Sequence, residues 1–262
     1  MHLELLDVQR RVQARIPLPS FDCNERLLAD HQAAARPLLR FEEIPIELTD
    51  LRLVVRQTAE ILHRFDALDD ADNQRIQALG RDAALPSLIG DWYRATAERH
   101  VAASVAATPG SAPGPAPLAD VAGATLDQVL TLALRPFLAR CAEAVQQRPE
   151  LAIWRHPYCP LCGGEPELAV ITPAAERHLI CSRCGLHWKF EPLTCPFCRN
   201  SDRARITSFA TPDGQYRVYA CDVCTRYLKA YDGRRARRAV MPVVDGVATL
   251  PLDAAAMQRG YT

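Results

Sequence analysis

The sequence predicts an α+β fold, with a helical N-terminal domain followed by two small β-rich modules of the rubredoxin-like or zinc-ribbon kind. Apolar residues recur at helical spacing in the first 150 residues, whereas eight of the ten cysteines form four Cys-x-x-Cys pairs between residues 159 and 224, among short alternating segments. We therefore expect a helical domain at 1–150, a four-cysteine metal module at 151–190, and a second at 191–262 that includes C-terminal strands.

Three helices are predicted with clear apolar stripes in the N-terminal part. Residues 51–65 place apolar side chains at i, i+3, i+4 and i+7, and Thr49 is positioned to cap the start of this helix. Residues 88–96 form a second stripe. Residues 126–145 form a third, in which Pro136 should introduce a kink because its ring removes a backbone donor.

Two other segments of the N-terminal part are less regular. A weaker apolar pattern predicts a helix over residues 24–39, and the run Thr108–Pro117 is too rich in proline and glycine for either regular element. We expect that run to be an exposed loop. Cys141 lies on the apolar stripe of its helix, so we expect it to pack in the core, and we expect the same of Cys23.

Short alternating segments predict two β-hairpins in the C-terminal part. Residues 168–171 and 178–180 flank a Pro-Ala-Ala turn, and residues 206–209 and 216–219 flank a Pro-Asp-Gly turn. Residues 186–190 alternate like a further strand. Each hairpin ends at a cysteine pair, so the predicted strands would deliver the cysteines to common points.

The cysteine spacing indicates two metal sites. Two residues between thiolates form a tight turn that directs both sulfurs at one ion, while amide groups inside the turn can donate to the sulfurs. Gaps of 18 and 22 residues separate the first pair from the second and the third from the fourth, enough for one hairpin each, whereas the middle gap of 10 is a connector. Sequential pairing would give a first site of Cys159, Cys162, Cys181 and Cys184, and a second site of Cys195, Cys198, Cys221 and Cys224.

Other arrangements of these residues remain open at this point. The pairs could interleave, as in cross-braced zinc domains, and His187 could replace a sulfur because it follows Cys184 by three residues. Thioredoxin-like chemistry is disfavoured, because it uses a single Cys-x-x-Cys at a helix start. Closed four-thiolate sites leave no exchangeable position for a substrate, which argues against a catalytic zinc and for a protein that is not an enzyme.

The turns and surfaces beside the pairs add three expectations. Glycine follows the first two pairs but Arg199 and Thr225 follow the others, so these two turns must hold a side chain at positive φ. Arg183 and Arg199 are expected to be exposed beside the pairs and able to contact a partner. The first module has about 40 residues, near the size that needs a metal to fold, so Cys181→Ser should disorder it while the helices persist.

Charge and composition limit the classes of function. The 262 residues carry 31 basic and 31 acidic side chains, a balance that disfavours a dedicated nucleic-acid binder. The cluster Arg234–Arg238 is expected to be a solvated turn. The N-terminus shows no secretory signal, and no apolar run is long enough to span a membrane, so we expect a cytoplasmic protein, in which metal binding is a better explanation for paired cysteines than disulfides.

At the cysteine pairs the sequence resembles the formate dehydrogenase accessory protein family, FdhE. The resemblance rests on the runs CPLCGG, CSRCGLHW, CPFC and CDVCTRYLK, which follow a helical half, and it includes Trp154, Trp188 and the segment 227–229. It implies a cytoplasmic factor that binds the catalytic subunit of a respiratory molybdenum formate dehydrogenase and assists its maturation.

The same resemblance implies that the eight paired cysteines hold two iron ions in rubredoxin-like sites. The sulfur ligands by themselves favour zinc. Both metals accept four sulfurs, but zinc binds more tightly than ferrous iron in the affinity order of divalent metals. The alternative function is a zinc-ribbon protein that binds nucleic acid or acts in transcription. A small electron-transfer protein is a further alternative.

Overall fold

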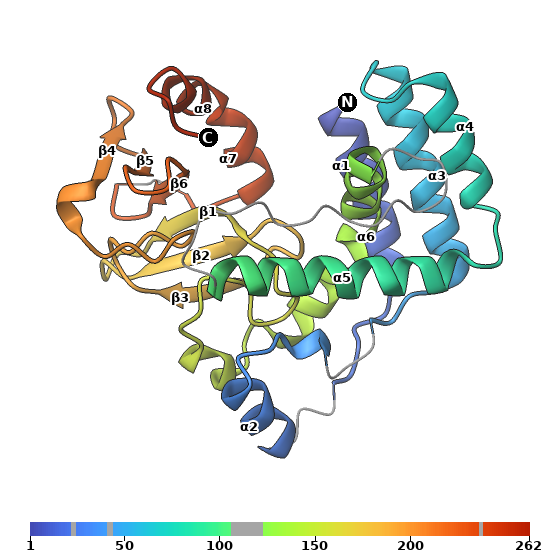
Figure 1. The fold of residues 1–262 in the computed structure, drawn as a ribbon, viewed down its shortest axis with the longest axis horizontal. Coiled ribbons are helices and arrows are strands. Elements are labelled where there is room, and N and C mark those ends of the chain that lie inside the picture. Colours follow the sequence, from blue (N-terminus) through green and yellow to red (C-terminus); the bar gives the residue numbers. More distant parts are fainter. Residues whose placement is uncertain (22–24, 41–43, 106–122, 236–237) are drawn as a thin grey trace.

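The computed structural model describes residues 1–21, 25–40, 44–105, 123–235 and 238–262 (Figure 1). The predicted loop at Thr108–Pro117 and the predicted core residue Cys23 lie outside these ranges. Within them the chain is helical up to residue 145 and forms a sheet from residue 166 onward, with two further helices near its C-terminus. The predicted α+β fold class is confirmed, whereas the domain boundaries after residues 150 and 190 stay predictions.

The helical part is built around three helices that pack against one another. Contacts join α1, α3 and α6, and α4 packs on α3. None of the described helices is long and apolar enough to cross a membrane. The bounds are α1 His2–Arg15, α2 Glu25–Ala33, α3 Leu48–Arg64, α4 Asp70–Leu79, α5 Leu85–Val105 and α6 Gly123–Val145, with short 3-10 turns at Leu38–Arg40 and Pro149–Ile153.

The three clear helix predictions are confirmed by α3, α5 and α6. The last of these runs unbroken through Pro136, whose ring is buried. The predicted cap at Thr49 is wrong, because α3 begins at Leu48, two residues earlier than a cap at Thr49 requires. Glu47 is the N-cap, and its Oε2 accepts a 2.9 Å hydrogen bond from the Asp50 amide, so Thr49 lies in the first helical turn.

The weaker helix prediction over residues 24–39 is confirmed only in part. The helix α2 ends at Ala33, and Ala35 adopts a left-handed backbone with φ of 50°. Pro37 then excludes a continuing helix, because a proline lacks the amide donor and disfavours the helical conformation of the residue before it. A separate 3-10 turn follows at Leu38–Arg40.

The C-terminal part forms a six-stranded sheet in the order β3-β2-β1-β6-β5-β4. Both predicted hairpins are present, as antiparallel β1–β2 and β4–β5, and the expected third strand is β3. The bounds are β1 Pro166–Ile171, β2 Arg177–Cys181, β3 His187–Phe190, β4 Ile206–Ala210, β5 Tyr216–Cys221 and β6 Tyr227–Asp232.

One parallel strand pair joins the two three-stranded halves of this sheet. Strand β1 runs parallel to β6, with Leu168 opposite Lys229, whereas every other pairing is antiparallel. A side-chain contact spans the same boundary, because Arg226 donates to both carboxylate oxygens of Glu165, at 3.1 and 2.7 Å. The two predicted modules therefore share one continuous sheet.

The expectation of strands at the C-terminus is wrong beyond β6. Residues Pro242–Ala248 form α7 and Leu250–Met257 form α8. A proline in the first turn of each helix and the alanine run of α8 favour helix over strand. Asp253 of α8 ties this segment to the sheet by accepting hydrogen bonds from the Tyr227 hydroxyl at 2.8 Å and from Lys229 Nζ at 2.6 Å.

The main hydrophobic core extends from the helices into the first half of the sheet. Val54 and Phe137 of the helices belong to the same buried cluster as Leu161, Leu179 and Trp188 of the first module. A separate small cluster of Val218, Ala220 and Ala256 lies between β5 and α8. Loss of the first module would therefore expose part of the helical core.

This shared core predicts the effect of Leu161→Ala. Leu161 is fully buried, so removing its side-chain atoms should lower the free energy of unfolding by about 2–5 kcal/mol, the usual cost of a buried leucine. Denaturant titration followed by far-ultraviolet circular dichroism should show the helices unfolding earlier. As a control, Val223→Ala, at a site that is 51% exposed, should change the value by less than about 0.5 kcal/mol. An unchanged helical transition in Leu161→Ala would contradict the shared core.

Candidate metal centre

The four Cys-x-x-Cys turns share one backbone geometry. In each, the amide of the residue after the second cysteine donates to the carbonyl of the first cysteine. These bonds run from Gly163 to Cys159 at 2.9 Å, from Gly185 to Cys181 at 3.1 Å, from Arg199 to Cys195 at 2.9 Å and from Thr225 to Cys221 at 2.9 Å. The repeated bond closes each turn around its two sulfurs.

The expectation of positive φ after each pair is confirmed. The angle is 73° at Gly163 and Gly185, 62° at Arg199 and 59° at Thr225. A side chain in this left-handed conformation costs about 1–2 kcal/mol. The two turns of the second site, which end in Arg199 and Thr225, are therefore strained. The two turns of the first site avoid this strain because they end in glycine.

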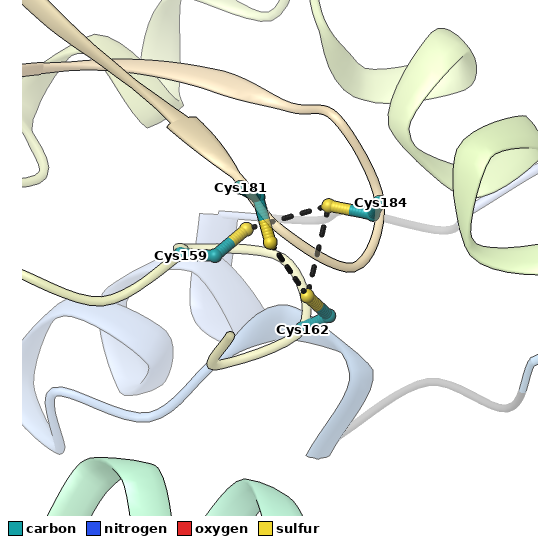
Figure 2. Close-up of side chains that lie close together, drawn as sticks. All are labelled: Cys159, Cys162, Cys181 and Cys184. Carbon is teal, nitrogen blue, oxygen red and sulfur yellow. Dashed lines mark hydrogen bonds between the residues drawn. The ribbon is translucent and has the colours of Figure 1, made fainter. Parts of the chain in front are cut away.

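The first site brings together the two turns at residues 159–162 and 181–184. Figure 2 shows their four sulfurs pointing toward one another, from a loop and from the turn that follows β2. The separations between sulfurs are 3.6 Å for Cys159–Cys184, 3.4 Å for Cys162–Cys181 and 3.6 Å for Cys162–Cys184. All four side chains are buried.

The second site has the same form at the other half of the sheet. Cys195 and Cys224 have sulfurs 3.7 Å apart, and Cys198 and Cys221 have sulfurs 3.6 Å apart. Cys198 and Cys224 are only half-buried. The second site is therefore more open to solvent than the first.

The geometry of both clusters suits a metal ion. Four sulfurs placed about 2.3 Å from a central ion at tetrahedral angles lie about 3.8 Å apart. The separations of 3.4–3.7 Å between sulfurs are close to that value, and the sulfurs within each group all lie within 4.8 Å of one another. Two four-cysteine clusters are thus present that could hold two metal ions, and the pairing is sequential, not interleaved.

The pKa values in the first cluster are shifted by the burial and close packing of its thiols. Burial raises the pKa of Cys159 and Cys184 well above the ordinary value. Burial also acts on Cys181, but hydrogen bonds from Cys159, Cys162 and Cys184 outweigh it and hold its pKa well below the ordinary value. Among Cys159, Cys181 and Cys184, the thiolate form is therefore favoured only at Cys181. A metal ion must displace these protons, so its affinity should fall as the pH falls.

The helical part encloses the first cluster. The amides of Leu38 and Leu39 donate to the carbonyls of Pro160 and Leu161 at 2.8 and 3.0 Å, which holds the first turn from outside. From α5, the Tyr93 hydroxyl donates to the Cys162 carbonyl at 3.3 Å. Site one is therefore positioned by segments that lie far from it in the sequence.

A small cavity adjoins the second cluster. Its volume is about 140 Å³, and its walls include Cys195, Cys221 and three arginines, Arg177, Arg226 and Arg234. The guanidinium carbon of Arg226 lies 3.7 Å from the centroid of the Phe197 ring. The walls are basic and apolar, with no carboxylate among the described residues that form them.

The remaining residues singled out from the sequence lie outside both clusters. His187 is in β3 and belongs to neither group of sulfurs. Cys141 is fully buried in α6, as expected, and burial raises its pKa to about 12. In the basic cluster, Arg234 pairs with the buried Asp232 at 2.8 Å, which lowers the pKa of Asp232 to about 2, and Arg238 pairs with the buried Asp245.

The expectation that Arg183 and Arg199 are exposed is confirmed for Arg199 and wrong for Arg183. Arg199 is exposed, but Arg183 is only 5% exposed because it packs under Trp92 of α5. Arg177, which the sequence analysis did not single out, is also buried, at 4% exposure. Strand alternation contained a signal for it, because Arg177 falls in phase with the buried Leu179 and Cys181.

The packing around site one predicts a specific effect of Gly164→Ala. A Cβ at this position would lie 2.8 Å from Cys181 Sγ, so the sulfur must shift, and we expect a loss of about 1–3 kcal/mol in the free energy of unfolding. The metal content of site one should fall with it. Gly185→Ala is the matched control, because φ is 73° but no atom lies within 4 Å of its new Cβ. The control should show strain of about 1–2 kcal/mol without metal loss. Equal metal retention in both variants would contradict this geometry.

Comparisons with known proteins agree with this architecture. No family model matches the chain. It is 29% identical to the protein FdhE homolog of Aquifex aeolicus over 133 residues, which are 49% of this chain and 46% of the relative. It is 31% identical to protein FdhE of Escherichia coli over 107 residues, which are 40% of this chain and 34% of the relative. The matches thus span less than half the length of these curated relatives.

Among solved structures, the chain is similar to the crystal structure of the FdhE protein from Pseudomonas aeruginosa. The TM-score is 0.60 at 18% identity, and the superposition covers 100% of this chain and 84% of that one. The likeness to that structure establishes the fold, and the sequence matches supply the relationship. The resemblance inferred from the cysteine runs is confirmed, because the chain is similar to FdhE proteins in sequence and has the fold of a solved FdhE structure.

Proposed function

We propose that this protein holds one metal ion in each four-cysteine cluster and acts as an accessory factor for a respiratory molybdenum formate dehydrogenase. In this proposal it binds the catalytic subunit in the cytoplasm and assists its maturation. The observation that carries the proposal is the pair of complete four-sulfur clusters on an FdhE fold.

The form of the clusters supports a role without turnover. All eight paired cysteines would be metal ligands, so each ion would have four protein sulfurs and no exchangeable water. Metal-assisted hydrolysis requires such an open position. The clusters therefore suit stabilising a fold and shaping a surface better than activating a substrate.

For the metal we favour iron, as the family resemblance implies, with zinc as the alternative. A four-sulfur tetrahedral site accepts either ion, and the order of divalent affinities places zinc above ferrous iron. Availability in the cell would then decide which ion occupies the sites. Iron would give the protein a thiolate-to-ferric absorption in the visible range, whereas zinc would leave it colourless.

The unequal exposure of the clusters predicts the order of metal loss. A chelator should remove one equivalent quickly from site two, where Cys198 and Cys224 are half-buried, and the other slowly from the enclosed site one. Time-resolved metal analysis of the full chain would show two phases. Cys224→Ser should lack the fast phase and keep the slow one. A single phase, or a fast phase that survives in Cys224→Ser, would contradict the assignment.

The proposed partner can be tested by affinity capture. Tagged protein taken anaerobically from cells that make the dehydrogenase should recover its catalytic subunit, and metal analysis of the same sample should find two iron ions. Arg199→Ala should weaken the complex without releasing metal, because Arg199 is exposed and can pair with a carboxylate. Loss of such a desolvated pair costs about 2–5 kcal/mol, enough to deplete the captured subunit.

The control for this experiment is Arg203→Ala, which removes an exposed arginine outside the cysteine turns. A strain without the protein should make the subunit but lack formate dehydrogenase activity. Normal activity in that strain, or no recovery of the subunit, would overturn the proposal. Salt-dependent binding of DNA or RNA by the same sample would instead favour the nucleic-acid alternative. Two zinc ions in protein from iron-replete cells would overturn the choice of iron.

A further inference from the structure

Two buried arginines lie beside the clusters without a carboxylate partner. Arg183 and Arg177 are 5% and 4% exposed, and neither forms an ion pair with an acidic side chain in the described part of the chain. Other arginines nearby are paired, such as Arg226 with Glu165. A guanidinium stays protonated in a protein, and burying its charge without compensation is strongly unfavourable. Both positions therefore require a source of negative charge.

Arg183 lies against the first cluster. Its Cδ and the sulfur of Cys181 are 3.1 and 2.8 Å from the point that a Cβ on Gly164 would occupy, so the two side chains flank the same glycine. The Arg183 amide also donates to Cys181 Sγ at 3.4 Å. Its guanidinium carbon is 5.6 Å from the Trp92 ring centroid, and Nη1 is buried without a hydrogen-bond partner. The aliphatic stem of Arg183 thus passes beside Cys181, and its guanidinium is buried next to Trp92.

Arg177 occupies the corresponding place at the second cluster. It forms the wall of the 140 Å³ cavity together with Cys195 and Cys221. Its Nη1 donates at 2.7 Å to the carbonyl of Thr194, the residue directly before Cys195, while Nε is buried without a partner. The rings of Phe190 and Tyr219 lie 5.9 and 5.8 Å from its guanidinium carbon. These contacts fix a positive charge at the base of the third cysteine turn.

We propose that Arg183 and Arg177 are built-in countercharges, each for the metal-thiolate cluster beside it. This inference rests on the proposed binding of a metal to each cluster. Four thiolates around a divalent ion carry a net charge of about −2, which supplies the negative charge that each arginine lacks. The two residues are positioning residues that select for the doubly negative cluster, and so for a divalent ion in each site.

The charge has a measurable consequence for metal binding. Groups outside the ligand set that support a metal site change its affinity by about 10- to 100-fold when removed. Arg183→Met should therefore weaken zinc binding by that factor at site one only, and Arg177→Met at site two only. In iron-loaded protein each variant should lower the reduction potential of its own site, because the ferrous cluster is one charge more negative. If the loss of affinity is tenfold larger for the ferrous form than for the ferric form, the reduction potential falls by about 59 mV.

Conservative variants separate charge from packing. Arg183→Lys and Arg177→Lys keep the positive charge and should restore most of the affinity and potential. Arg199→Met is the matched control, because it removes an exposed charge at the edge of a cysteine turn and should change zinc affinity less than about twofold, since water screens exposed charges. If a Met variant does not fold, Arg183→Gln and Arg177→Gln remove the charge while keeping a hydrogen-bond donor.

The experiment measures full-length protein by zinc competition with a chromophoric chelator, by cadmium-113 resonances that report the two sites separately, and by redox titration of the iron form. Site-specific weakening with a lowered potential, rescued by lysine, supports the inference. Unchanged zinc affinity and potential in both Met or Gln variants would overturn it, as would equal losses in the Met and Lys variants, which indicate packing alone. If the wild-type protein binds no metal, the proposed function itself fails, and that outcome is distinct from these.

Discussion

The convergence of four sulfurs at the end of each three-stranded half is the constraint on which the C-terminal structure depends. Each half of the sheet has few residues and little apolar area of its own, so strand pairing alone leaves it marginal. The cysteine turns close the open end of each hairpin, and the repeated amide-to-carbonyl bond presets the direction of both sulfurs before any ion arrives. The parallel pairing of β1 with β6 then joins the halves into one sheet.

The two clusters share this geometry but sit in different surroundings. Site one is covered by Leu38 and Leu39 from one side and by Tyr93 of α5 from another, and its module shares a core with the helices. Site two lies next to a cavity, and α8 packs against strand β5 of its half of the sheet. The first cluster is therefore enclosed by the body of the protein, whereas the turns of the second are partly accessible from solvent.

The arginines of the sheet region also fall into two groups, those paired with a carboxylate and those without such a partner. Four described arginines of the sheet region, Arg217, Arg226, Arg234 and Arg238, pair with carboxylates. The guanidinium groups of Arg183 and Arg177 instead lie against aromatic rings, which stabilise a buried cation only weakly. In the proposed countercharge role, these two arginines would couple charge balance inside the protein to metal binding.

The sequence by itself determined the elements whose cause is local. Helices α3, α5 and α6 follow from apolar spacing, the hairpins from alternation around turn residues, and the positive φ of Arg199 and Thr225 from their place after a cysteine pair. Sequential pairing of the cysteines was favoured in the same way, because each gap holds one hairpin, but the folded structure was needed to exclude interleaved pairing. All of these depend on residues within about one hairpin of each other along the chain.

Tertiary structure alone decided what depends on distant contacts. The expectation that Arg183 is exposed is wrong because Trp92, far away in the sequence, covers it. The enclosure of site one depends in the same way on backbone hydrogen bonds from Leu38 and Leu39. The parallel pairing of β1 with β6 and the packing of α8 on β5 are equally non-local. Local patterns report which face of an element is apolar, but burial depends on which segment covers that face, and only the folded chain brings those segments together.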